Sequence, residues 1–97
     1  MSDEKRRVDV EVQVMFGTDL NKVKNILQEL LEADDRILKQ PAPTVELMQL
    51  KNSTIDIRIY FWVVQVQYDW MYTRSDLILE IDRVFKEHEI EMPMPEA

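Results

Sequence analysis

The segment Thr54-Ile-Asp-Ile-Arg-Ile-Tyr-Phe-Trp-Val-Val64 decides the fold of this chain. Its apolar side chains fall at every second position from Ile55 to Val63, and all five are β-branched or aromatic. An alternation with a period of two is typical of a β-strand that buries one face. No other segment is as apolar, so we place this strand at the centre of a sheet, with its odd-numbered residues toward the core.

Composition and charge limit the class of protein. The 97 residues fit one domain, and a hydrophobic fraction of 45% is sufficient for a core. The net charge of −7 argues against a surface that binds nucleic acid or an anionic membrane. The chain has no cysteine and no segment that fits a membrane span or a signal peptide. We therefore expect a domain that acts in water, unless a membrane part was removed.

Two clear periodic patterns precede the central strand. Alternating valines over Val8–Val14 predict a strand with one apolar and one polar face. Apolar residues spaced by three and four over Leu20–Leu31 predict an amphipathic helix that ends near Asp34. Thr18 and Asp19 are the candidate caps of this helix.

The segment Thr44–Leu50 also predicts a strand, but its apolar phase slips near Met48 and Gln49. Such a slip indicates a β-bulge or an edge strand that is partly buried on both faces. Asn52 and Ser53 form a polar turn before the central strand. The two strands are therefore expected to form a hairpin.

The last third of the chain predicts a second helix and a short strand. Asp69 is the candidate helix cap. The tail is extended, because Pro93 and Pro95 exclude a helix, and we expect a last strand at Glu89–Met92 on a sheet edge. The core stripe of the helix is expected to consist of Trp70, Leu77, Ile78, Ile81, Val84 and Phe85.

The expected fold class is α+β, with the order β-α-β-β-α-β of a ferredoxin-like domain. This is a two-layer sandwich in which an antiparallel sheet carries two helices on one face. Right-handed crossovers place the first and third strands side by side in the middle. We expect residues 1–6 to be a disordered or artificial lead-in and residues 7–97 to be the domain.

The residues do not predict chemistry. His88, the only histidine, falls near the end of the second helix, where a cation favours the helix dipole. Asp34 and Asp35 are expected to be solvated charges, and Asp56 and Arg58 to belong to a solvated ladder on the open face of the sheet. We therefore expect no enzyme, no catalytic residue, no cofactor and no metal site.

Aromatic residues mark a candidate interface on the open face. Tyr60 and Trp62 cannot share a face with the core residues of the central strand, and Tyr68 follows soon after. Aromatic residues on a second face indicate contact with another domain or subunit. Tyr60, Trp62 and Tyr68 are therefore the candidate interface residues.

Seven segments carry a resemblance to a known family: Val8–Val14, Gly17-Thr-Asp-Leu20, Asp35-Arg-Ile-Leu38, Pro43, Asn52-Ser-Thr-Ile55, Arg58–Val63 and Ile90-Glu-Met-Pro-Met-Pro95. From about Arg7 to Glu96, the chain resembles the C-terminal α/β domain of the small-conductance mechanosensitive channels (MscS-type). The resemblance implies a ferredoxin-like domain in the cytoplasmic cage of a heptameric channel in a bacterial or archaeal inner membrane, which opens in osmotic downshock. The partners would be identical subunits, and contact with the membrane would be made only through parts absent from this chain.

The chain departs from this family at three places. Glu89 replaces a glycine that usually caps the second helix, so that turn is expected to close differently. Lys51 replaces another common glycine, and the strand that closes a small barrel beneath the cage is missing after Pro95. We expect a fragment that is a monomer or a weak oligomer by itself. The alternative function is a stand-alone ferredoxin-like regulatory domain that binds a small ligand at a subunit interface.

Overall fold

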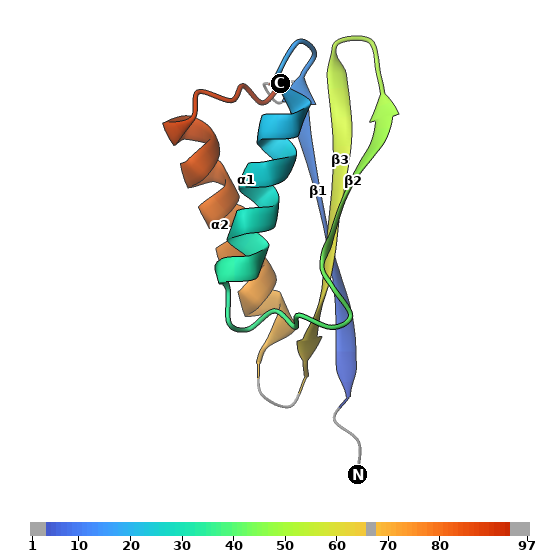
Figure 1. The fold of residues 1–97 in the computed structure, drawn as a ribbon, viewed down its shortest axis with the longest axis vertical. Helices are drawn as coiled ribbons and strands as arrows, with labels where there is room; N and C mark the ends of the chain where they lie inside the picture. Colours follow the sequence, from blue (N-terminus) through green and yellow to red (C-terminus); the bar gives the residue numbers. More distant parts are fainter. Residues whose placement is uncertain (1–3, 66–67, 94–97) are drawn as a thin grey trace.

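Five elements follow one another in the order β-α-β-β-α over the residues that the structure describes, 4–65 and 68–93 (Figure 1). The structure is a computed structural model. The elements are β1 (Lys5–Met15), α1 (Leu20–Ala33), β2 (Thr44–Leu50), β3 (Thr54–Val64) and α2 (Trp70–Glu87).

The sheet has the order β1-β3-β2, and both pairings are antiparallel. The strand predicted to be central, β3, is central, and β1 pairs with it without interruption from Lys5 opposite Val64 to Met15 opposite Thr54. The predicted hairpin and bulge are confirmed, because the register of β2 against β3 shifts between Leu47 and Gln49. β2 is one edge of the sheet.

Both helices cover the same face of the sheet, and the core lies between the two layers (Figure 1). The odd-numbered residues of β3 from Ile55 to Val63 are buried, as predicted. The stripe of α2 is confirmed except at Ile78, which is 39% exposed. Ile78 lies about 100° around the helix from buried Leu77, on the flank of α2 beside Arg74. Buried Thr73 takes the position one turn before Leu77.

Aspartates begin both helices. Asp19 is the N-cap of α1, and its Oδ1 accepts a hydrogen bond from the Lys22 amide at 3.2 Å. Asp69 is the N-cap of α2, and its Oδ1 accepts from the amide of Met71 at 2.9 Å. Each carboxylate satisfies an amide that the first helical turn leaves without a partner.

The expected last strand at Glu89–Met92 is wrong, so the ferredoxin-like order is incomplete. The described fold is β-α-β-β-α, with three strands, and β1 lies at an edge of the sheet instead of in the middle. Up to residue 93, where the described tail ends, the tail makes one backbone bond to β1, from the Met15 amide to the Glu91 carbonyl at 3.0 Å. The next position of that register is Pro93, which has no N–H to continue a ladder.

The N-terminal boundary also differs from the expected one. β1 begins at Lys5, so Lys5 and Arg6, which the sequence assigns to the lead-in of residues 1–6, are paired with β3 in the structure. The amide of Gln65 donates to the carbonyl of Glu4 at 2.9 Å and extends this ladder by one further pair.

Glu89 closes the end of α2 in a left-handed conformation, with φ 56. Its amide donates to the carbonyl of Lys86, and the Ile90 amide donates to that of Phe85 at 2.8 Å. These two bonds, with buried Ile90 near Phe85, form a Schellman motif. The expectation that this turn closes differently without glycine is wrong, because Glu89 adopts the conformation that glycine usually supplies.

Candidate subunit interface

Tyr60 and Trp62 lie two positions apart on the open face of β3, and both are half-buried. The guanidinium of Arg7 lies over the Tyr60 ring, 4.2 Å from its centroid. Arg7 also donates from Nε to Oδ1 of Asp9 at 3.0 Å. Tyr60 is therefore covered in part by a cation of its own sheet.

Trp62 is held at the position where the chain returns from α1. Its carbonyl accepts a hydrogen bond from the Leu38 amide at 2.9 Å. Tyr68 is half-buried in the connection to α2, where its amide donates to Val64 at 3.2 Å. The structure thus places Tyr60 and Trp62 on one face, while Tyr68 lies beyond the end of β3. Their role in an interface stays a prediction.

The rest of the open face is a ladder of partly exposed charges. Arg58 Nη2 lies 3.6 Å from Glu11 Oε1 across the β1–β3 pair, so Arg58 belongs to this ladder, as predicted. Asp56 pairs instead with Lys51 at 3.0 Å and accepts a hydrogen bond from Gln13 at 2.8 Å. The Gln13 amide, followed by Lys51, lowers the pKa of Asp56. Such exposed pairs contribute little to stability.

An apolar patch at the β2–β3 hairpin was not predicted from the sequence. We call it the hairpin-end patch; Leu50 is 62% exposed and Phe16 is 64% exposed. A groove of about 310 Å³ runs between these side chains and Ile55. The phase slip in β2 was the available signal, since a bulge turns consecutive side chains outward. The patch consists of Phe16, Leu47, Met48 and Leu50.

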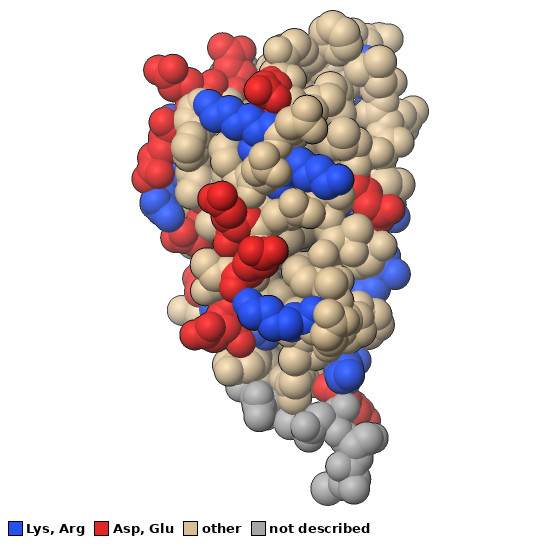
Figure 2. All heavy atoms as spheres, viewed as in Figure 1, with Lys and Arg blue, Asp and Glu red and all other residues tan. Residues whose placement is uncertain are grey.

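The outer side of α2 carries a second set of exposed apolar side chains. Tyr72 and Leu79 are each 65% exposed. Figure 2 shows Asp and Glu side chains gathered along the α2 side of the molecule, whereas the hairpin end is largely uncharged. The exposed apolar residues of α2 are Met71, Tyr72, Ile78 and Leu79.

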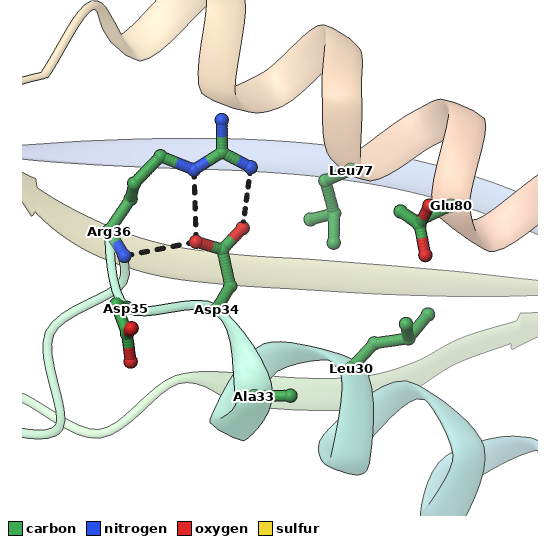
Figure 3. Close-up of a pocket in the computed structure, with 7 residues that line it drawn as sticks. All are labelled: Leu30, Ala33, Asp34, Asp35, Arg36, Leu77 and Glu80. Carbon is green, nitrogen blue, oxygen red and sulfur yellow. Dashed lines mark hydrogen bonds and ion pairs between the residues drawn. The ribbon is translucent and has the colours of Figure 1, made fainter.

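Arg36 fills one side of an open pocket of about 410 Å³ between α1 and α2 (Figure 3). Its Nε and Nη2 donate to the carboxylate of Asp34 at 2.9 and 2.8 Å, and its Nη1 donates to Asp76 at 2.9 Å. Burial opposes the charge of Asp34, but the hydrogen bonds from Arg36 outweigh it and lower the pKa of Asp34. Asp34 is therefore a paired anchor, and the expectation of a solvated charge is wrong. Asp35 beside it is exposed.

The described residues contain no cluster of three or more carboxylate, histidine or cysteine side chains that would hold a metal ion. In the same part of the chain, neither helix has the length and apolar character needed to cross a membrane. His88, the C-cap of α2, is exposed.

Residues 8–92 match the protein family described as the C-terminal domain of the mechanosensitive ion channel MscS. The chain is 29% identical to the small-conductance mechanosensitive channel of Edwardsiella ictaluri over 92 residues, covering 95% of the chain and 32% of that protein. It is 28% identical to an uncharacterized MscS family protein of Synechocystis, covering 94% of the chain and 30% of that protein. The chain thus spans about one third of the length of these relatives.

Solved structures share the fold. The closed-state crystal structure of Helicobacter pylori MscS matches with a TM-score of 0.85 at 20% identity, covering 96% of this chain and 36% of that one. The cryo-EM structure of Arabidopsis thaliana MSL1 matches with a TM-score of 0.76 at 16% identity, covering 94% and 34%. At these identities the likeness concerns the fold alone.

Proposed function

Because this chain belongs to the family of MscS mechanosensitive channel C-terminal domains, a channel family without enzymatic activity, we propose that it forms part of a channel's cytoplasmic cage. Its role there is structural: it packs against identical subunits around the vestibule below the pore. The observation that carries the proposal is the family match, which extends over residues 8–92 and so over nearly the whole described domain.

The partners in this role are identical subunits, seven in the heptamer that the resemblance implies. The exposed surfaces support contacts with neighbours, because monomers rarely leave several apolar side chains exposed together. The hairpin-end patch and the open-face residues Tyr60 and Trp62 are the surfaces we assign to these contacts. The rest of the open face is charged, with Arg58 and Glu11 at its centre, and suits exposure to water.

A chimeric channel tests the proposal. Residues 7–97 replace the corresponding segment of the Edwardsiella ictaluri channel, and the chimera is produced in bacteria that lack mechanosensitive channels. We expect survival of hypo-osmotic shock and tension-gated currents in patch-clamp recordings. The matched controls are Ile59→Asp, which disrupts the core, and Arg58→Ala, which leaves it intact. A chimera that reaches the membrane at normal levels, yet gives neither currents nor protection, would overturn the proposal.

A further inference from the structure

The outer edge of β1 is an open hydrogen-bonding edge over most of its length. The odd-numbered residues of β1 direct their backbone groups away from β3, as the outward bonds of Asp9 and Met15 show. Among the described residues, the Asp9 carbonyl accepts from Arg74 Nε at 2.9 Å and the Met15 amide donates to Glu91. The outward backbone groups of Arg7, Glu11 and Gln13 have no backbone partner among the residues that the structure describes.

An apolar groove of α2 runs beside this edge. Met71, Arg74 and Ile78 lie on one flank of the helix, and Arg74 reaches the edge itself. The Trp70 ring lies under the Arg6 guanidinium, 4.1 Å from its carbon, which also places the start of α2 next to β1. The groove has a volume of about 350 Å³, and Met71 is 63% exposed. An open edge above an apolar groove is the arrangement that binds an added strand.

The described tail does not fill this position. It touches β1 once, at Glu91, and Pro93 interrupts the ladder at the next position. The described residues thus leave this edge open to a strand from another chain, such as a second copy.

The order of basic and acidic residues along β1 indicates which chain would supply the added strand. The side chains on the open face are basic in the first half of the strand, at Lys5 and Arg7, and acidic in the second, at Asp9 and Glu11. An antiparallel second copy with Arg7 opposite Asp9 also places Lys5 opposite Glu11. The two-fold axis repeats both pairs, so four pairs of opposite charges face each other. A shift by two residues places either Asp9 opposite Asp9 or Arg7 opposite Arg7.

We propose that the edge of β1 binds the same edge of a second copy of this chain in that register. The two three-stranded sheets then join into one, and the apolar flanks of the two α2 helices meet beside the seam. The contact uses one surface on both copies, so it is distinct from the head-to-tail contacts that close a ring, and it does not depend on the proposed function. The net charge of −7 on each copy opposes the contact, so the dimer is weak.

Charge exchange at the seam tests the proposal by analytical ultracentrifugation of the 97-residue chain. Because the two-fold axis repeats the pair, Asp9→Arg places like charges opposite each other at two positions and should weaken dimerization roughly tenfold. Arg7→Asp should have the same effect. The double variant Arg7→Asp/Asp9→Arg restores complementarity and should dimerize about as well as the wild type. Arg58→Ala, on the same face but away from the edge, is the control. Circular dichroism and melting curves confirm that each variant is folded.

Arg74 gives an independent check. It shares the Asp9 carbonyl with the incoming strand, so Arg74→Ala should leave dimerization unchanged or strengthen it. A wild-type chain that remains monomeric at millimolar concentration, or a double variant no better than the single ones, would overturn the proposal. Weaker dimerization in Arg74→Ala would place Arg74 inside a different interface and overturn the register.

Discussion

Arg36, in the loop after α1, donates from Nη1 to Oδ2 of Asp76 in α2 at 2.9 Å. The same guanidinium also donates to the carboxylate of Asp34, the C-cap of α1. One side chain therefore joins the end of one helix to the middle of the other. The Asp34 side chain is only 15% exposed and that of Arg36 is 27% exposed. The pair therefore contributes more than a solvated ion pair does.

Arg36→Ala should lower the free energy of unfolding by about 1–3 kcal/mol, because it leaves the carboxylate of Asp34 half-buried without its partner. Asp76→Asn is the matched control and should cost less than about 1 kcal/mol, since the Asp76 side chain is 40% exposed. Urea denaturation followed by circular dichroism measures both. Equal costs for the two variants would contradict the assignment of Asp34 as the main partner.

Protonation of Asp34 should lower the stability of the domain in acid. Its pKa in the folded state lies below the ordinary value of 3.8, so its contribution is fully present above pH 3.8 and is lost as the pH falls through the folded pKa. The difference in unfolding free energy between the wild type and Asp34→Asn should therefore shrink below pH 3.8. Urea titrations between about pH 2.5 and 6 measure the difference. A difference that grows as the pH falls would contradict this prediction.

Substitutions on the two faces of β3 should differ sharply in how much they destabilise the domain. Ile59 is fully buried, so Ile59→Asp places an unpaired carboxylate in the core and should cost about 3–5 kcal/mol. Arg58→Ala, one residue away on the open face, should cost less than about 1 kcal/mol. Thermal melting distinguishes them, and an unchanged melting temperature in Ile59→Asp would mean that the faces are reversed.

Glu89→Gly should stabilise the domain. A left-handed conformation is unfavourable for a residue with a Cβ, so glycine at this position should add about 1 kcal/mol. The expected rise in melting temperature is about 4–8 °C for a domain of this size. Glu89→Ala keeps the Cβ and serves as the control, with no gain expected. If alanine stabilised as much as glycine, the cause would lie in the lost charge and not in the backbone.

Trp62→Ala should weaken assembly in the chimeric channel more than it weakens folding. Trp62 is half-buried on the open face, so its truncation leaves the buried face of β3 intact. We expect a several-fold loss of cross-linked oligomer at equal membrane expression. Lys24→Ala, an exposed position on α1, is the control. Undiminished oligomer with Trp62→Ala would remove this residue from the interface.

Local signals account for most of what the sequence predicts correctly. The alternation from Ile55 to Val63 reflects which face of the strand is buried. Asp19 and Asp69 accept hydrogen bonds from amides two or three residues away. The last strand depends instead on a distant partner, and a single bond to Met15 does not make a ladder. Likewise, Arg36 meets Asp76 forty residues later, a contact that no periodic pattern encodes.

The hydrogen bond between Met15 and Glu91 has a mechanical consequence. It holds the described C-terminal part of the domain at the end of β1, while the chain enters β1 at Lys5, at the opposite end of a body 48 Å long (Figure 1). A pull between these two ends acts parallel to β1, and 11 consecutive residues of β1 are paired with β3. The load therefore acts in shear, and its backbone bonds have to break together instead of one after another. The domain should therefore resist tension that is applied along its length.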